Sequence, residues 1–278
     1  MINKIKFPNY LNPYENKNII RLGNDYDGGY LVDKESVLET EILISIGISY
    51  DWTFEKDFFK LNSCKISSYD GSVGKNFFYA KIKNRMKNIL NKKSGAYLIK
   101  TIWWIILPFR FFIFFNNFRL VNRKKHFEMF VYENNKKLDI DYFVYKNGYN
   151  PKFIRFYEII EKIPSDKIIF LKIDIEGEEY SLLDSLIRYQ YRFTSLVIEF
   201  HNLDKNNYQI LEEFIQKFNL ILSHTHINIA GGFNDDGMPK VIELTFVKNL
   251  KKEKKVEKLP HLLDMDTYPT DIKHEVIF

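Results

Sequence analysis

The sequence has only one cysteine among its 278 residues, Cys64, and this scarcity excludes two kinds of architecture. A single cysteine cannot form a disulfide within the chain, and it cannot build a zinc site from several thiolates. The first ten residues also lack the apolar stretch and the small-residue cleavage site of a secretory signal. These absences predict a protein of the cytoplasm.

Acidic residues are missing from a long central segment. No Asp or Glu occurs between Asp70 and Glu128, whereas thirteen Lys or Arg do. The formal net charge of the chain is +5, so the remainder of the chain sums to 5 − 13 = −8. A mildly acidic body that carries a basic segment can attract nucleotide phosphates, acidic lipid or nucleic acid through that segment.

Internal repeats and Gly/Ser-rich linkers are also lacking, which favours one domain over residues 1–278. The chain has no complete G-x-G-x-x-G fingerprint, and this argues against a nicotinamide-dependent enzyme. The most apolar run, residues 102–115, is interrupted by Pro108 and Arg110 and is short for a bilayer span.

Apolar, β-branched runs that alternate with amphipathic segments predict an α/β fold. The expected strands are residues 41–47, 64–69, 167–174 and 195–200, and the expected helices are residues 51–59, 178–189 and 208–218. Such alternation is typical of a parallel sheet that helices cover on both faces. No helix separates the last two expected strands, 220–227 and 240–247, so we expect an antiparallel hairpin at one edge of the sheet.

Polar or small residues follow four of the expected strands: Gly47 with Ser49, Asp70, Asp174 and His201. Ligands of open α/β sheets bind beyond the carboxyl ends of the strands, so these residues are the first candidates for a site. A small residue lets a ligand approach the backbone. A carboxylate at the end of the next strand can accept hydrogen bonds from both hydroxyls of an adenosine ribose.

Five ordered segments resemble the FkbM-like family of S-adenosylmethionine-dependent methyltransferases. They are residues 21–23 with 27–32 (Asp-Gly-Gly-Tyr-Leu-Val), 46–51 (Ile-Gly-Ile-Ser-Tyr-Asp), 171–177 (Leu-Lys-Ile-Asp-Ile-Glu-Gly), 197–201 (Val-Ile-Glu-Phe-His) and 239–246 (Pro-Lys-Val-Ile-Glu-Leu-Thr-Phe). The resemblance covers roughly residues 20–72 and 155–250. It implies a Rossmann-like, seven-stranded methyltransferase sheet and transfer of a methyl group to oxygen, often on a sugar or a secondary metabolite.

The resemblance also implies a cofactor site. Gly47 and Ser49 would border the methionine part of S-adenosylmethionine, Asp70 would bind its ribose, and Asp51 lies near the same turn. Ile48 and Tyr50 replace the small residues that many methyltransferases have in this loop.

Methyl transfer needs alignment of the acceptor and removal of its proton. Asp174 and His201 are the expected catalytic pair, and either could be the general base. A divalent metal is a second route, with Asp174, His201 and His226 as a hypothetical ligand set at successive strand ends. We expect His224, two residues before His226, to be structural.

These features predict an O-methyltransferase that acts on a sugar or nucleotide-linked sugar during synthesis of a surface polysaccharide such as capsule or lipopolysaccharide. Three alternatives stay open. One is a methyltransferase for a lipid, peptide or other small metabolite. Another is an RNA-binding or RNA-modifying protein, although the acidic body leads us to expect no nucleic-acid partner. The last is a membrane-associated scaffold without enzymatic activity.

The basic aromatic segment, at about residues 75–127, does not resemble the family's core, and we predict a helical insert there. Its aromatic residues could cap the active site. Residues 101–118 could instead form a homodimer contact or a peripheral anchor at the inner face of the membrane, because Trp and Phe with basic flanks suit anionic lipid. A transmembrane helix is the third interpretation.

Overall fold

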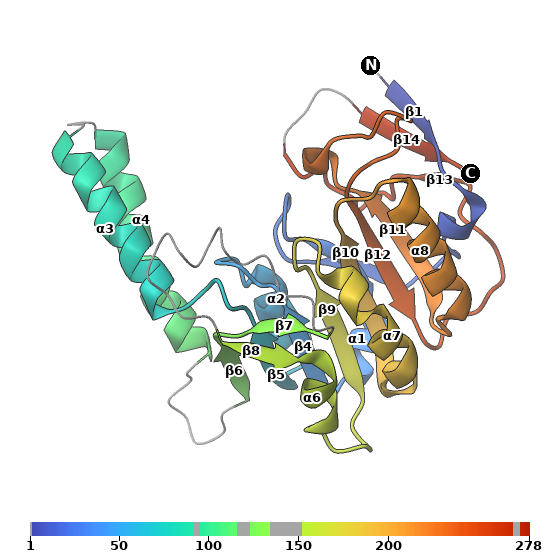
Figure 1. Ribbon diagram of the computed structural model, residues 1–278, viewed down its shortest axis with the longest axis horizontal. Helices are drawn as coiled ribbons and strands as arrows, with labels where there is room; N and C mark the ends of the chain where they lie inside the picture. Colours follow the sequence, from blue (N-terminus) through green and yellow to red (C-terminus); the bar gives the residue numbers. More distant parts are fainter. Residues whose placement is uncertain (1, 92–94, 116–122, 134–151, 269–272) are drawn as a thin grey trace.

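A seven-stranded sheet forms the centre of the computed structural model, which describes residues 2–91, 95–115, 123–133, 152–268 and 273–278 (Figure 1). In spatial order its strands are β11 (Ile221–Ile227), β12 (Ile242–Val247), β10 (Phe193–Phe200), β9 (Ile169–Ile173), β4 (Ile42–Ile46), β5 (Lys65–Tyr69) and β6 (Lys124–Phe127). The five strands from β10 to β6 are parallel, and β12 is antiparallel to both of its neighbours. The predicted α/β sheet with an antiparallel edge hairpin is confirmed.

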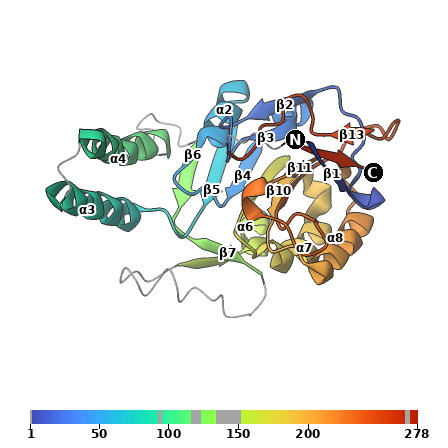
Figure 2. The same cartoon turned by 90° about the horizontal axis from the view of Figure 1, so that it is seen from above.

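The central strands have side chains that are buried on both faces, as a covered parallel sheet requires. Every residue of β4, β9 and β10 is buried. One face is covered by α6 (Phe156–Glu161), α7 (Glu179–Tyr189) and α8 (Lys205–Lys217), and the other by α1 (Lys34–Glu39) and α2 (Thr53–Leu61). Seen from above, α2 lies on the opposite side of the sheet from α7 and α8 (Figure 2).

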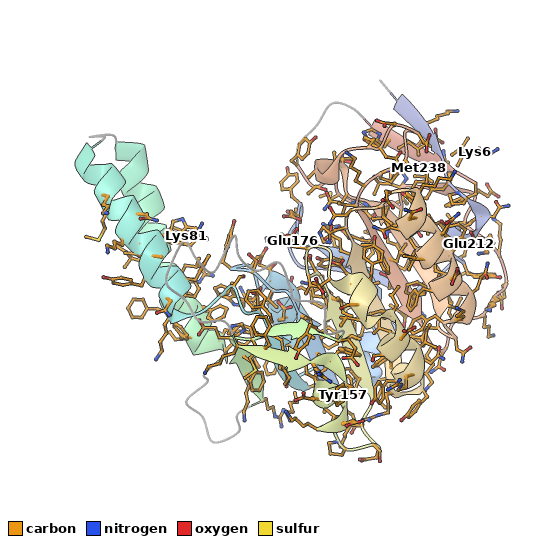
Figure 3. The ribbon with its side chains drawn as sticks, in the orientation of Figure 1. Lys6, Lys81, Tyr157, Glu176, Glu212 and Met238 are labelled. Carbon is orange, nitrogen blue, oxygen red and sulfur yellow. The ribbon has the colours of Figure 1, made fainter. Side chains whose placement is uncertain are left out.

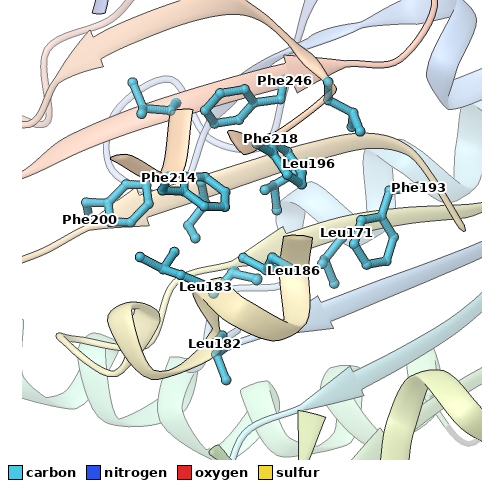
Figure 4. Close-up of a cluster of buried hydrophobic side chains, with 14 of the residues drawn as sticks. Leu171, Leu182, Leu183, Leu186, Phe193, Leu196, Phe200, Phe214, Phe218 and Phe246 are labelled. Atoms are coloured by element: carbon cyan, nitrogen blue, oxygen red, sulfur yellow. The ribbon is translucent and has the colours of Figure 1, made fainter. Parts of the chain in front are cut away.

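The sequence pattern of each helix explains the face that it presents to the sheet. Leu182, Leu183 and Leu186 of α7 share one side and pack with Phe214 of α8 and Phe246 of β12 (Figure 4). Spacings of three and four residues place such side chains on one stripe of a helix. The stripe is apolar and the sheet offers an apolar surface, so burial of both stabilises the layer.

Two helices, α3 (Lys75–Asn91) and α4 (Gly95–Phe115), form the connection between the parallel strands β5 and β6. Parallel neighbours need a long crossover, and this helical hairpin supplies it. It projects away from the sheet (Figure 1). Within the segment expected to be a helical insert, residues 75–91 and 95–115 are helical, whereas residues 124–127 form strand β6 of the sheet. Residues 92–94 and 116–122, which include part of the expected contact segment 101–118, lie outside the described residues.

Helix α4 has one buried and one exposed apolar side. Phe111 and Phe115 are buried in the core beneath α2, and Trp104 and Leu107 lie on the same side. Ile106, Phe109 and Ile113 lie on the opposite side and are exposed. No helix in the part of the chain that the structure describes is both long and apolar enough to cross a membrane.

Smaller strand pairs surround the main sheet, and the sequence pattern did not predict them. Strand β1 (Ile2–Lys6) pairs in parallel with β14 (Lys273–Ile277), which pairs with β13 (Lys258–Leu259). A hairpin of β2 (Ile19–Leu22) and β3 (Tyr30–Asp33) packs near the sheet, and β7 (Phe130–Tyr132) pairs with β8 (Phe153–Arg155). The β1–β14–β13 sheet lies at the opposite end of the molecule from the α3–α4 hairpin (Figure 1).

Candidate active site

The carboxyl ends of β4, β5, β9 and β10 bring four candidate residues to one edge of the sheet. These strands are neighbours in the order β10–β9–β4–β5 and run in the same direction. Gly47, Asp70, Asp174 and His201 each follow one of them directly. Figure 3 shows Glu176, two residues beyond Asp174, at the edge of the body that faces the space between the α3–α4 hairpin and the β1–β14–β13 sheet.

The turn after β4 is shaped by close backbone approach. Gly47 has φ of 76°, and a Cβ atom on it would lie 1.5 Å from the carbonyl oxygen of Asp174. Only glycine fits there. Lys172 fixes the same peptide, because its Nζ donates to the Gly47 carbonyl at 2.8 Å. Ser49 also has a positive φ, 49°, so the chain reverses sharply after the strand.

Asp70 is fastened to that turn. Its Oδ2 accepts a hydrogen bond from the Ser49 backbone N–H at 2.7 Å. Its Oδ1 accepts from the backbone N–H of Ser72 at 2.7 Å and from the Ser72 hydroxyl at 2.6 Å. The carboxylate is thus oriented by the protein, and three of its roughly four lone pairs are already used.

Asp51 lies on the far side of the turn, half-buried, between the β4–α2 connection and the loop of the β2–β3 hairpin. Its Oδ1 accepts from the Thr53 backbone at 2.9 Å, and its Oδ2 accepts from the side chain of Asn24. The neighbouring Tyr50 contacts the helical hairpin: its ring lies 6.2 Å from that of Phe77 and 5.4 Å from that of Trp104. The base of the hairpin therefore forms one wall beside this turn.

His201 is surrounded by carboxylates. Its Nδ1 lies 2.8 Å from Oε1 of Glu179, which is fully buried. Its Nε2 faces Oε2 of Glu176 at 3.6 Å, Oδ1 of Asp174 at 3.9 Å and Oε2 of Glu199 at 3.9 Å. Since Glu179 also accepts from the backbone N–H groups of Ile175 and Gly177, it is held rigidly and orients the ring.

These neighbours change the ionisation of the site. Burial on its own would lower the pKa of His201, but the hydrogen bond to Glu179 and the charges of Glu179, Asp174 and Glu176 outweigh it, so the pKa is raised. The neighbours of Glu199 also change its pKa. Burial, reinforced by the charges of Asp174 and Glu243, raises its pKa well above the ordinary value.

Asp174 is placed by groups that pattern analysis missed. The hydroxyl of Tyr30 on β3 donates to its Oδ2 at 2.9 Å, and Lys172 Nζ lies 3.9 Å from the same oxygen. Tyr30 belongs to the Asp-Gly-Gly-Tyr segment and Lys172 to the Lys-Ile-Asp segment, so the resemblance contained the signal. Glu179 had no such signal, because its role depends on the fold of the loop before α7.

His226 does not join Asp174 and His201, and the predicted ligand set is corrected here. Its Nδ1 lies 3.2 Å from Oδ1 of Asp264, and His224 Nε2 contacts the same oxygen at 2.9 Å. Residues two apart on a strand point to the same face, which is why both histidines reach Asp264. At the strand ends, the residues whose ligand atoms lie close enough for a shared ion are instead Asp174, Glu176 and His201.

Comparison with known proteins agrees with the resemblance. Residues 117–224 match the family model described as the Methyltransferase FkbM domain. This range includes the segments 171–177 and 197–201, but not 27–32 or 46–51. It also includes residues 117–127, the end of the basic aromatic segment, which we expected to lie outside the family's core. No match was found among curated proteins.

Three solved structures are similar to the chain. Methyltransferase FkbM from Methylobacillus flagellatus KT has 14% identity and a TM-score of 0.38, over 74% of this chain and 44% of that one. Precorrin-6y C5,15-methyltransferase from Geobacter metallireducens has 10% identity and a TM-score of 0.30, over 77% and 84%. M. jannaschii TYW2 in complex with AdoMet has 9% identity and a TM-score of 0.31, over 84% and 88%.

The chain thus spans less than half the length of the FkbM structure that it resembles. The family match falls on the strands that carry Asp174 and His201, within a seven-stranded α/β sheet. The chain therefore resembles the FkbM methyltransferase domain over residues 117–224.

Proposed function

We propose that the chain is an S-adenosylmethionine-dependent O-methyltransferase whose acceptor is a hydroxyl of a sugar or nucleotide-linked sugar. The observation that supports this best is the placement of His201. Its Nδ1 is fixed by buried Glu179, and its Nε2 faces Asp174 and Glu176 at the strand edge that also carries the Gly47–Ser49 turn and Asp70.

The residues at the turn fit the cofactor. Asp70 is held by two backbone N–H groups at 2.7 Å and by the Ser72 hydroxyl at 2.6 Å, which leaves one carboxylate lone pair for a ribose hydroxyl. The second ribose hydroxyl would take the place of the Ser72 hydroxyl. Gly47 and Ser49 leave the sheet with positive φ, so backbone rather than side chains lines the end of β4. We assign the methionine part of the cofactor to this turn, with Asp51 beside it.

When bound, S-adenosylmethionine supplies a methyl group on an electrophilic sulfonium. The chain's own task is then to orient the acceptor and remove its proton. Because Nδ1 of His201 is bonded to Glu179, Nε2 is the nitrogen available to accept that proton. Glu179 and Asp174 stabilise the imidazolium that results, and Tyr30 keeps Asp174 in place.

A divalent metal is a second route at the same edge. Asp174, Glu176 and His201 would hold it, and a metal-bound hydroxyl would lose its proton more easily. The two routes exclude each other, because a metal on Nε2 would remove His201 as a base. Loss of turnover after exhaustive chelation, with recovery on adding Mg²⁺ or Mn²⁺, would favour the metal; unchanged turnover would favour the histidine.

The sugar class of the acceptor comes from the family resemblance, and the basic hairpin adds a physical argument. Helix α3 begins shortly after Asp70, the residue that follows β5. It carries three exposed lysines, Lys75, Lys81 and Lys83. Their charge would attract the phosphates of a nucleotide-linked sugar, and salt would weaken that attraction. We place this activity in the synthesis of a surface polysaccharide.

We further propose that the hairpin rests on an anionic membrane surface. Ile102, Ile106, Phe109 and Ile113 follow one another at spacings of four, three and four, and their exposed fractions are 48%, 48%, 67% and 62%. An exposed apolar stripe on a helix whose flanks are basic is suited to the interface of a bilayer that carries negative lipid. Such a contact would hold the enzyme at the inner face of the membrane.

Calorimetry and mass spectrometry test the catalytic assignment. We expect Asp70→Ala to weaken binding of S-adenosylmethionine and S-adenosylhomocysteine at least about tenfold, because the ribose loses its acceptor. Asp174→Ala and His201→Ala should bind the cofactor normally and lower kcat about a hundredfold or more. A gain of one methyl mass on a nucleotide sugar measures turnover.

Glu179→Gln provides the matched control, since it keeps the shape of the side chain and removes its charge. We expect it to lower kcat and to shift the pH profile of kcat, whereas KM for the cofactor stays constant. Cofactor affinity that is unchanged in Asp70→Ala would contradict the ribose assignment, and full activity in His201→Ala would contradict the base.

A further inference from the structure

A second group of potential ligands lies outside the candidate active site, where the segment after β13 crosses the edge strand β11. His224 and His226 project from one face of β11, and Asp264 reaches them from that segment. The side chains of His224 and Asp264 are each 4% exposed, and that of His226 is 11% exposed. The three side chains come from parts of the chain about forty residues apart, so the tertiary fold assembles them.

The geometry converges on one point. His224 Nε2 and His226 Nδ1 lie 2.9 and 3.2 Å from the same carboxylate oxygen, Oδ1 of Asp264. His224 Nε2 forms a hydrogen bond with this oxygen. Ligands of a tetrahedral ion at about 2.1 Å lie about 3.4 Å apart, so a small shift of the two rings would make room for an ion. The other oxygen, Oδ2, accepts from the His261 backbone at 2.7 Å, which leaves Oδ1 directed at the two rings.

A cavity of about 150 Å³ adjoins this group and offers further ligand atoms. His226, Asp264, Asp266 and His274 are among its lining residues. The Nδ1 atom of His274 is buried and has no hydrogen-bond partner among the residues that the structure describes. A buried ring nitrogen without a partner is costly unless water or a ligand satisfies it. Because His274 lines the same cavity as His226 and Asp264, the unpartnered nitrogen points to a ligand in this cavity.

We propose that His224, His226 and Asp264 bind a divalent transition-metal ion of the zinc type, with the cavity beside them holding its remaining water or substrate ligands. Imidazole and carboxylate together favour Zn²⁺, Fe²⁺ or Ni²⁺ over Mg²⁺ or Ca²⁺. The site is distinct from the Asp174–Glu176–His201 group, and it does not depend on the proposed methyl transfer.

An ion at this position would also stabilise the fold. It would join β11, at the edge of the main sheet, to the segment that leads from β13 to β14. A metal that binds the folded state and not the unfolded chain stabilises the fold in proportion to its affinity. Removal of the ion should therefore loosen this side of the molecule without disturbing the Gly47–Ser49 turn.

Metal content and affinity of the intact protein test the proposal. The full chain is stripped with chelator, reloaded with Zn²⁺, and analysed by elemental mass spectrometry and titration calorimetry. We expect one equivalent of Zn²⁺ in the wild type, and a loss of affinity of at least about a hundredfold in His226→Gln and Asp264→Asn. Replacement by Co²⁺ should give visible absorption bands that the two variants lack.

His201→Ala and His261→Ala serve as controls, because each removes an imidazole outside the proposed set. Both should retain the equivalent of Zn²⁺. Loss of the ion in His201→Ala alone would assign it to the active site and overturn the proposal, as would retention in every variant. If His226→Gln does not fold, the change in Tm on adding Zn²⁺ is measured instead. An increase in Tm that the wild type and His201→Ala share would support the proposed site, and no increase in either would overturn it.

Discussion

At the scale of single residues, the site depends on a carboxylate that has no motif of its own. His201 and Asp174 could be proposed from the sequence because they follow apolar strands. Glu179 could not, since its carboxylate reaches His201 only after the loop 174–178 folds back and buries it. The same holds for Asp264, which lies about forty residues from the histidines that it contacts. Pattern analysis finds residues at strand ends, but not partners that tertiary folding supplies.

A second buried carboxylate leads to a prediction about pH. Glu55 on α2 is fully buried; the Ser45 hydroxyl donates to its Oε1, whereas its Oε2 has no partner among the described residues. Burial raises its pKa, an effect that Lys172 and the Ser45 hydrogen bond only partly offset. A carboxyl whose pKa is higher in the folded state binds its proton more tightly there. Stability therefore falls as the pH rises above the pKa of the unfolded state.

Glu55→Gln removes this ionisation. We expect the free energy of unfolding of the variant, relative to the wild type, to rise as the pH is raised from about 5 to about 7. Urea unfolding at a series of pH values measures it. Two parallel stability curves would show that Glu55 does not titrate in this range.

At the scale of elements, the strands rich in apolar residues were predicted from the sequence, and the short or basic ones were not. Strands β4, β9 and β10 consist mostly of apolar residues, many of them β-branched, so their sequences identify them. Strand β6 reads Lys-Lys-His-Phe, which is short and basic, and the sheet context alone makes it a strand. Its assignment to a helical segment was wrong for this reason. A helical insert was expected over about residues 75–127, but neither its division into two helices nor its place as the β5–β6 crossover was.

The hairpin carries the prediction at this scale. We expect the protein to sediment with vesicles of phosphatidylcholine and phosphatidylglycerol, and not with phosphatidylcholine alone. Binding should fall about tenfold or more when the salt concentration is raised from about 0.1 to about 0.5 M. The double variant Ile106→Asp and Phe109→Asp should lose binding, because it places charge in the apolar stripe.

Leu262→Asp is the control, since Leu262 is 99% exposed and lies far along the chain from the hairpin. It should bind vesicles as the wild type does. A double variant that still binds would exclude the stripe as the contact. Conversion of a dimer to a monomer in that variant would identify a second copy of the chain as the partner, and salt-sensitive binding of RNA in place of vesicles would identify a nucleic acid.

At the scale of the whole molecule, the sequence predicted the class of the fold and the edge where the candidate site lies. It did not predict the β1–β14–β13 sheet, because pairing between distant strands leaves no local pattern. Nor did it separate the two groups of metal-type ligands: His224 and His226 lie on the edge strand β11, whereas Asp174 and His201 follow β9 and β10, on the other side of β12. The organisation of residues 1–278 as one domain stays a prediction.

Substitution of Phe7 would measure how strongly the N-terminal segment is attached to the rest of the protein. Its side chain is 2% exposed, its backbone donates to Ile277 at 2.9 Å, and its ring lies 6.4 Å from that of Phe278. We expect Phe7→Ala to lower the free energy of unfolding by about 3–5 kcal/mol. Phe109→Ala, at a position that is 67% exposed, should change it by less than about 0.5 kcal/mol. Equal effects in urea unfolding would contradict this view of the two positions.

The parallel pairing of Ile2 with Lys273 also bears on the order of folding. Contacts between residues so far apart in the sequence require a large loop to close, and the entropy of that closure slows their formation. The hairpins and neighbouring βα units of the body close much smaller loops and can form earlier. We therefore expect the β1–β14 pair, and with it the cavity beside His274, to assemble last during refolding.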